Sequence, residues 1–176
     1  MSRASRKSVK PPLAGMTREK NGTPLVADFR TEFVEELLPM WRSSFEEAVG
    51  ITDPHPLEEQ RAYFMHEVIP HNSVRVALMH GEIVGFVAAS SVSVAQLYVH
   101  TRFQRRGIGT LLLDWAKNQS GGSLWLYTFA RNSQACSFYE GSGFRAVARG
   151  FESMWQLEDV KYEWSLDRMR FKPSDV

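Results

Sequence analysis

The sequence predicts an α/β fold with a mixed, mostly antiparallel central sheet of about six to seven strands, flanked by about four helices. Short apolar runs bounded by turn residues recur along the chain, and segments with apolar residues at helical spacing lie between some of them. A length of 176 residues with 43% hydrophobic residues fits one compact domain. We therefore expect a flexible basic tail over residues 1–22 and a single domain over residues 23–170.

The first elements are a strand within residues 23–29 and a helix that begins near Thr31. Pro39 lies inside the helical pattern, and because proline removes a backbone hydrogen bond, we expect a kink or a split there. After a loop, the apolar spacing over residues 57–68 predicts a second helix that ends before Pro70.

Three consecutive strands follow. Residues 74–79 and 83–89 form two apolar runs joined through His80-Gly81, a pair suited to a tight hairpin turn. Ser90-Ser91 supplies another tight turn, which leads into a strand over residues 94–99. These short connections predict an antiparallel arrangement.

The next segment joins this strand to a strongly periodic helix through Gln-Arg-Arg-Gly-Ile-Gly, residues 104–109. Ile108, Leu111, Leu112 and Trp115 recur at i, i+3, i+4 and i+7, which predicts one buried face. The first N–H groups of a helix lack intrahelical partners and carry the positive end of its dipole. The loop therefore predicts a phosphate or pyrophosphate site.

The two glycines allow close approach of the backbone to such a ligand, although a Gly-x-Gly pair can also form only a tight turn with a close helix contact. A P-loop requires Gly-Lys-Ser/Thr, and the dinucleotide fingerprint requires a third glycine. Because Thr110, Leu111 and Leu112 follow Gly109, both of those sites are excluded.

A second block has the order strand, helix, glycine stop, strand over residues 124–144, and a final strand covers residues 159–164. Asn132, Ala135, Cys136 and Tyr139 fall on one face of its helix. Asn132 is a suitable N-cap for that helix.

The order Gln-x-x-Gly-x-Gly after a strand, followed by Asn-x-x-Ala-x-x-Phe-Tyr-x-x-x-Gly-Phe, resembles the GNAT family of N-acetyltransferases. The resemblance is close over residues 84–144 and extends through the final strand. It implies the GNAT fold, acetyl-CoA as the acyl donor with no metal, and direct transfer of the acetyl group to an amine in a ternary complex.

The resemblance also implies the site residues. Backbone N–H groups over residues 105–110 would bind the pyrophosphate, with charge from Arg105 or Arg106, and the strand ending at Val99 would contact the pantetheine arm. Tyr139 is the expected general acid, since a phenol of pKa ~10 can protonate a thiolate whose thiol has a pKa of ~8.5; a core role is its alternative. The residues expected to bind acetyl-CoA are Leu97, Tyr98, Val99, Gln104, Arg105, Arg106, Gly107, Ile108, Gly109, Thr110, Asn132 and Tyr139.

The general base is left open. Some family members carry a glutamate five residues before the capping asparagine, where this chain has Tyr127. His55, Glu58 and Glu59 are expected to border the acceptor cleft and are candidate bases, as are Tyr127 and a water relay.

We expect the acceptor to be a small-molecule primary amine; Trp41, Phe45 and Trp155 could line an apolar pocket for it. The alternatives are a non-catalytic acyl-CoA-binding sensor and a protein or peptide N-acetyltransferase.

Charge and composition limit the classes of partner to be expected. The first 24 residues carry six basic side chains and one acidic side chain, which leaves the rest of the chain at a net charge of −4. We expect a solvated tail, with a nucleic-acid arm or an organellar presequence as alternatives, and no nucleic-acid partner. No apolar run approaches the ~20 residues of a membrane span, and a single cysteine agrees with a reducing compartment. We expect a cytoplasmic protein, with a homodimer left open.

Overall fold

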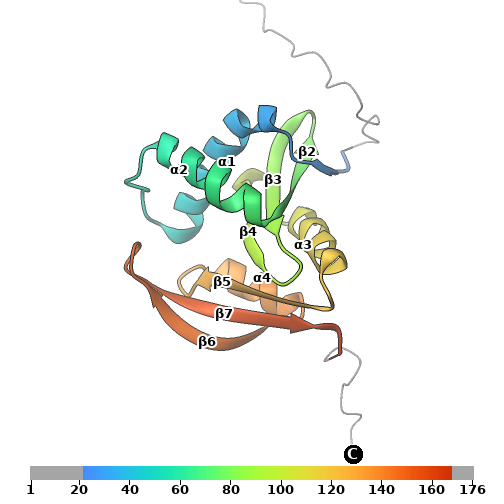
Figure 1. Cartoon of the computed structure of the whole chain (residues 1–176), viewed down its shortest axis with the longest axis vertical. Helices are drawn as coiled ribbons and strands as arrows, with labels where there is room; N and C mark the ends of the chain where they lie inside the picture. Colours follow the sequence, from blue (N-terminus) through green and yellow to red (C-terminus); the bar gives the residue numbers. More distant parts are fainter. Residues whose placement is uncertain (1–21, 168–176) are drawn as a thin grey trace, which may run out of the picture.

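The computed structural model describes residues 22–167, so the expected basic tail, Gly22 excepted, and residues 168–170 of the expected domain lie outside it. Seven strands and four α-helices form the described part (Figure 1). This arrangement confirms the α/β fold. The strands are β1 (Leu25–Asp28), β2 (Ser73–Met79), β3 (Glu82–Ala89), β4 (Val94–Val99), β5 (Ser123–Phe129), β6 (Arg145–Glu152) and β7 (Leu157–Ser165). The α-helices are α1 (Val34–Val49), α2 (Leu57–Tyr63), α3 (Ile108–Gln119) and α4 (Ser133–Gly141).

The seven strands divide into two antiparallel sheets with the orders β1-β2-β3-β4 and β5-β7-β6. The sheets meet at one parallel bridge between Ser93 and Trp125, beside a hydrogen bond of 3.0 Å from the Trp125 N–H to the Val92 carbonyl. Beyond this bridge β4 and β5 are not paired, and the second sheet lies below the first in Figure 1. The edge of β4 therefore faces an opening between the sheets.

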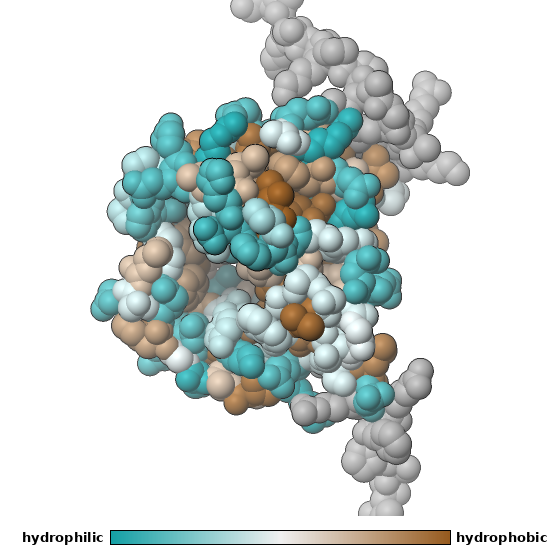
Figure 2. All heavy atoms as spheres, viewed as in Figure 1, coloured by the Kyte–Doolittle hydropathy of each residue, from teal (hydrophilic) through white to brown (hydrophobic). Residues whose placement is uncertain are grey.

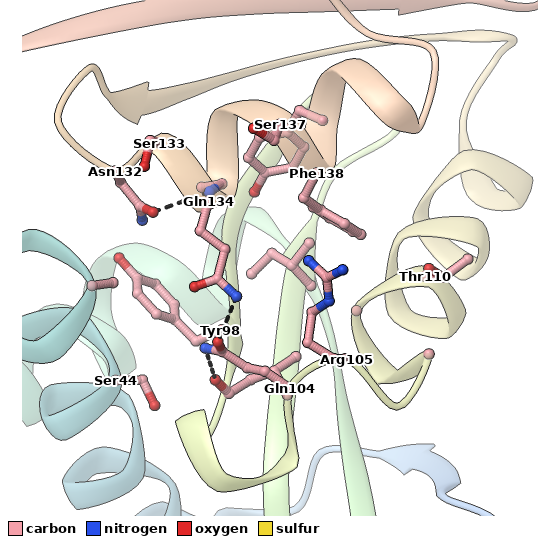
Figure 3. Close-up of a pocket in the computed structure, with 17 residues that line it drawn as sticks. Ser44, Tyr98, Gln104, Arg105, Thr110, Asn132, Ser133, Gln134, Ser137 and Phe138 are labelled. Atoms are coloured by element: carbon pink, nitrogen blue, oxygen red, sulfur yellow. Dashed lines mark hydrogen bonds between the residues drawn. The ribbon is translucent and has the colours of Figure 1, made fainter.

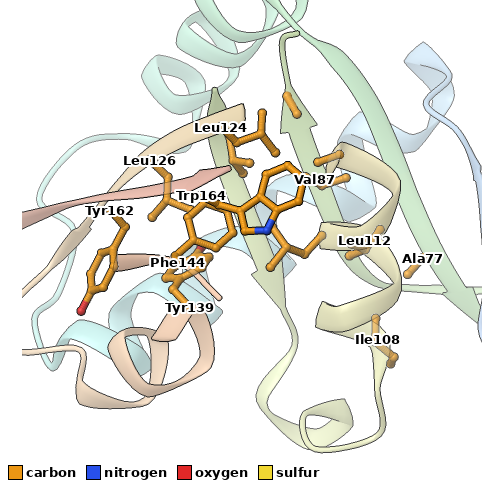
Figure 4. Close-up of a cluster of buried hydrophobic side chains, with 14 of the residues drawn as sticks. Ala77, Val87, Ile108, Leu112, Leu124, Leu126, Tyr139, Phe144, Tyr162 and Trp164 are labelled. Atoms are coloured by element: carbon orange, nitrogen blue, oxygen red, sulfur yellow. The ribbon is translucent and has the colours of Figure 1, made fainter. Parts of the chain in front are cut away.

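Helices cover both faces of the first sheet. Alternate residues of β2 show this, because Val76 and Leu78 pack with α1 whereas Ala77 and Met79 pack with α3. The hydrophobic core between the first sheet and α3 extends to the second sheet, where Tyr139 of α4 packs with the apolar face of β7 (Figure 4).

The tight hairpin between β2 and β3 is confirmed, since His80 and Gly81 have φ values of 53° and 77°, as a two-residue turn with both residues left-handed requires.

Two helical segments differ in detail from the expectation. Helix α1 runs unbroken from Val34 to Val49 across Pro39, so the expected split does not occur. Pro39 and Glu35 are both exposed, and the Glu35 carbonyl that loses its N–H partner therefore faces water. After α2, a π-helical turn (Phe64–Val68) and a 3-10 turn (Ile69–His71) carry the chain past Pro70. Pro70 lies in the first turn of that 3-10 segment, where a missing N–H costs little.

The buried face of α3 is rotated from the predicted one. Leu111 is 43% exposed and Trp115 is half-buried, whereas Leu113 and Ala116 are fully buried beside Ile108 and Leu112. Three consecutive leucines fit two adjacent helix faces, so their spacing alone could not choose between them.

Candidate active site

A cavity of about 510 Å³ lies where β4, α3 and α4 meet (Figure 3). One wall is the end of β4, with Leu97, Tyr98 and Val99, and the opposite wall is the start of α4. The loop before α3, the first turn of α3, and Ser44 and Ala48 of α1 complete it. The two sequence blocks, separate along the chain, therefore enclose one space.

The N-terminus of α3 opens into this cavity. Gly107 has a φ of 80°, supplies no side-chain cap, and accepts the first intrahelical bond from the Leu111 N–H at 3.0 Å. The N–H groups of the three residues between them precede the intrahelical ladder, and Gly109 and Thr110 line the cavity. This is the geometry expected of an anion site.

The two loop arginines differ in position. Arg105 has a left-handed φ of 62° and lines the cavity. The Arg106 guanidinium lies over the Phe103 ring, 5.3 Å from its centroid, and does not line the cavity. Ile108 also does not line it, because its side chain is buried in the core. Of the two arginines considered, only Arg105 lines the cavity into which the helix N-terminus opens.

Gln104 crosses the cavity to α4. Its Nε2 donates to the Val99 carbonyl at 3.0 Å, and its Oε1 accepts from Gln134 Nε2 at 2.8 Å, as Figure 3 shows. Sequence reasoning included Gln104 but missed the α4 residues that also line the cavity. These are Ser133, Gln134, Ala135, Ser137 and Phe138.

The N-cap prediction for Asn132 is confirmed. Its Oδ1 accepts a hydrogen bond of 3.0 Å from the Ala135 N–H. Because one oxygen satisfies the cap, the amide N–H groups of the same side chain are available at the cavity, which Asn132 also lines.

Tyr139 is a buried residue that lines the cavity. Its ring packs against Phe144 and Tyr162, with centroid distances of 5.8 and 6.0 Å, and only 7% of the residue is exposed. Burial raises the pKa of the Tyr139 phenol well above its usual value, so the hydroxyl stays protonated and can donate.

The Tyr98 ring packs toward α1, where its centroid lies 5.9 Å from that of Trp41. The ring stacks on Phe86 with a centroid distance of 6.0 Å and an interplanar angle of 17°. Burial raises the pKa of Tyr98 to about 12.

A second, smaller cavity of about 130 Å³ occupies the opening between β4 and β5. Tyr127, Phe129 and Asp159 line it from the second sheet. It shares several lining residues with the larger cavity, so the two spaces meet. The shared residues are Leu97, Tyr98, Asn132, Ala135 and Tyr139.

The candidate bases fall in different places. His55 Nδ1 lies 2.8 Å from Asp53 Oδ1, and its ring packs against Trp155 with a centroid distance of 5.4 Å, but His55 lines neither cavity. Glu58 and Glu59 are exposed on α2 and line neither. Tyr127 alone among the named candidates reaches a cavity.

The predicted acceptor aromatics also lie outside both cavities. Trp41 is buried between Phe86 and Tyr98, with centroid distances of 5.4 and 5.9 Å. Phe45 packs between Phe129 and Trp155, at 6.2 and 4.9 Å. Trp41 is therefore a core residue, whereas Phe45 and Trp155 support Phe129 at the smaller cavity.

Sequence reasoning missed Asp159. It lies on β7, where Asp159, Lys161 and Glu163 alternate with the buried Val160 and Tyr162. Such an alternation is typical of a strand with one solvated face, so nothing in the sequence indicated a cavity residue.

None of the helices in residues 22–167 combines the length and the apolar character needed to cross a membrane. Within the same residues, His, Cys, Asp and Glu side chains form no group of three or more that could hold a metal ion.

Comparison with known proteins agrees with this geometry. The sequence profile of the acetyltransferase (GNAT) family matches residues 32–144, which include the glycine loop and the Asn132 cap. The chain belongs to the GNAT acetyltransferase family.

Solved structures share the fold at low identity. The PaiA N-acetyltransferase of Thermoplasma acidophilum, in complex with coenzyme A, is 18% identical, with a TM-score of 0.65 over 81% of this chain and 99% of its own. YncA of Salmonella typhimurium, a putative acetyltransferase with acetyl-CoA, is 15% identical, with a TM-score of 0.62 over 87% and 99%. A ribosomal-protein-alanine N-acetyltransferase of Brucella melitensis is 18% identical, with a TM-score of 0.62 over 81% and 99%.

Proposed function

We propose that this protein is an acetyl-CoA-dependent N-acetyltransferase that transfers the acetyl group directly to a primary amine. One observation carries the proposal: the N-terminus of α3 opens into a cavity that continues past Tyr139 into the gap between β4 and β5. A long donor with an anionic end and a reactive end fits such a path. The coenzyme A in the PaiA structure and the acetyl-CoA in the YncA structure support this donor.

The residues divide the chemistry among them. The N–H groups at the start of α3 and the Arg105 guanidinium hold the pyrophosphate. The unpaired edge of β4 and the Asn132 amide bind the pantetheine arm, and a β4 N–H polarises the thioester carbonyl. The Tyr139 hydroxyl donates its proton to the departing sulfur. Holding donor and acceptor together supplies the rest of the acceleration.

A small-molecule acceptor is supported by the size of the second cavity, about 130 Å³, which admits a small reacting group. A protein N-terminus is the second candidate, because the fold is shared with a ribosomal-protein-alanine N-acetyltransferase. Either amine would enter from the side of α1 and α2, where Figure 2 shows a recess between these helices and the second sheet.

Two measurements test the proposal. The first is release of coenzyme A thiol from acetyl-CoA with a panel of amines and peptides; activity with an amine is expected, and binding without release would contradict the proposal. The second is calorimetry of acetyl-CoA with Gly107→Ala and Gly81→Ala. Both glycines have left-handed φ, 80° and 77°, and open space around a built Cβ, so both variants carry similar backbone strain. Only Gly107→Ala is expected to weaken binding, and equal affinities would contradict the anion site.

A further inference from the structure

We infer that Asp159, at the smaller cavity between β4 and β5, binds the ammonium group of a primary amine carried on an aromatic body. The inference rests on the proposed acetyl transfer and adds the acceptor class and a further catalytic residue.

The Asp159 carboxylate is shielded but unsatisfied. It lies on β7, the central strand of the second sheet, paired with Phe129 of β5 on one side and Gly150 of β6 on the other. Its Oδ1 is buried and has no hydrogen-bond partner among the described residues. Burying a carboxylate oxygen without a partner is costly, and a cationic group in the cavity that Asp159 lines would offset part of that cost.

A glycine makes room for this carboxylate. A Cβ built on Gly150 would lie 2.6 Å from Asp159 Oδ1, closer than a Cβ atom approaches a non-bonded atom in proteins. Gly150 has no left-handed φ, so its backbone conformation alone does not require glycine. The absent side chain therefore matters for the placement of the carboxylate.

The nearest cation on the same strand face is engaged elsewhere. Lys161 follows Asp159 on that face, but its Nζ lies 3.1 Å from Glu163 Oε1 and 5.7 Å from the centroid of the Trp125 ring. Arg149 pairs with Val160 and so points to the opposite face of the sheet. A cationic ligand is thus the natural partner for the Asp159 carboxylate.

The walls beside Asp159 favour an aromatic acceptor. Phe129 is its register partner and Tyr127 is one pleat further along β5, and both line the cavity. Phe45 packs behind Phe129, outside the cavity, and holds that ring in place. An amine with an aromatic ring a few bonds from its nitrogen can contact this surface while its ammonium group reaches Asp159.

The cavity brings the two catalytic groups to one small space. Its volume of about 130 Å³ is only a few times the ~30 Å³ that a water molecule occupies in the liquid. Asp159 and Tyr139 both line it. An amine inside it therefore lies close to a proton acceptor and to the proton donor of the leaving group.

The transfer balances with these groups. Asp159 accepts one proton from the ammonium and passes it to solvent. The neutral nitrogen attacks the thioester carbonyl carbon, the C–N bond forms, and the C–S bond breaks with its electron pair on sulfur. Tyr139 protonates the sulfur, and the second proton of the attacking nitrogen restores the Tyr139 hydroxyl. The products are the amide, coenzyme A and one proton.

The test uses phenethylamine as the probe acceptor and the full chain saturated with acetyl-CoA. Asp159→Asn is expected to lower kcat/KM for phenethylamine by about ten- to a hundredfold, the effect of losing one charge-assisted hydrogen bond. The affinity for acetyl-CoA should not change. The matched control is Glu158→Gln, which removes the same charge from an exposed side chain on the other face of β7 and should leave the rate unchanged.

Two further measurements keep the test decisive. Gly150→Ala should displace the carboxylate and raise the KM for phenethylamine. Calorimetry on the protein loaded with coenzyme A should show phenethylamine binding that Asp159→Asn weakens, whereas 2-phenylethanol, which has no ammonium group, should bind both proteins alike.

The outcomes separate the inference from the proposed function. If the unchanged protein releases thiol and the Asp159→Asn variant releases it at the same rate, the inference is overturned and the proposed function stands. Phenethylamine binding that depends on Asp159, with no thiol release from any amine, would contradict the function and support the site. Absence of both binding and release with phenethylamine, or a preference for aliphatic amines, would overturn the aromatic acceptor class.

Discussion

Phe138 of α4 packs directly against Gly109 in the first turn of α3. A Cβ built on Gly109 would lie 3.3 Å from Phe138 Cζ and 3.9 Å from Val99 Cγ2. All three residues line the larger cavity. The absence of a side chain at position 109 therefore sets how closely α3 and α4 approach at this cavity.

Gly109→Ala should weaken acetyl-CoA binding with little loss of stability. The half-buried Phe138 ring can yield by a few tenths of an ångström toward the cavity, and alanine gains about 1 kcal/mol of helix propensity over glycine. We expect the free energy of unfolding in urea to change by less than about 1 kcal/mol, and acetyl-CoA affinity by calorimetry to fall about tenfold, or 1.4 kcal/mol.

Phe138→Leu is the matched background for that test. A leucine at position 138 removes the ring edge that the new Cβ would meet. The alanine should therefore have a smaller effect on affinity in the double variant than alone. Additive effects would show that Phe138 does not transmit the substitution.

Tyr139→Phe should lower kcat by about a hundredfold at an unchanged acetyl-CoA affinity, because general acid catalysis typically contributes at least that much. Tyr162→Phe is the control, since Tyr162 is buried in the same cluster but does not line either cavity. It loses a hydrogen bond of 2.9 Å to Glu140 Oε1, which costs about 1 kcal/mol of stability. Steady-state kinetics of the two variants and of the unchanged protein test this. A kcat for Tyr139→Phe equal to that of the unchanged protein would remove Tyr139 from the mechanism.

The features that local sequence determines were predictable. The strand, glycine turn and helix around Gly107 depend on neighbouring residues, as does the Asn132 cap. The His80-Gly81 turn is equally local. Each of these follows from backbone preferences and hydrogen bonds within a few residues.

The smaller cavity depended on contacts between distant segments. Asp159 occupies an outward position of an alternating strand, and only the sheet order brings it beside Gly150 of β6 and to the β4–β5 opening. His55 appeared suited to catalysis, but its ring packs against Trp155, away from both cavities. Sheet order and strand separation decide where such side chains lie. The residue spacing within one segment does not predict either of them.

Pro39→Ala should stabilise the protein. Helix α1 continues through Pro39, so alanine would restore the N–H bond to the Glu35 carbonyl on an exposed face without leaving a cavity. The intrinsic gain approaches about 3 kcal/mol, and the greater freedom of the unfolded chain reduces it by up to about 1 kcal/mol. Urea unfolding should show an increase of about 1–2 kcal/mol with acetyl-CoA binding unchanged, and a decrease would mean that Pro39 fits a local distortion of α1.

Alkaline pH should unfold the protein through its buried tyrosines. Burial raises the pKa of Tyr98 to about 12, and the pKa values of Tyr139 and Tyr162 are also raised, with burial as the largest cause. Above about pH 10 the unfolded chain loses these phenol protons while the folded protein keeps them. Their contribution to stability is therefore complete below pH 10 and is lost as the pH rises through the folded-state values.

Urea unfolding at a series of pH values from 9 to 12 measures this loss. Each buried tyrosine that keeps its proton in the folded state adds up to about 1.36 kcal/mol per pH unit to the slope. Tyr98→Phe should make the slope shallower, because phenylalanine keeps the buried ring against Phe86 and has no proton to lose. A slope unchanged in Tyr98→Phe would show that this phenol ionises equally in the folded and unfolded chains, and would contradict its burial against α1.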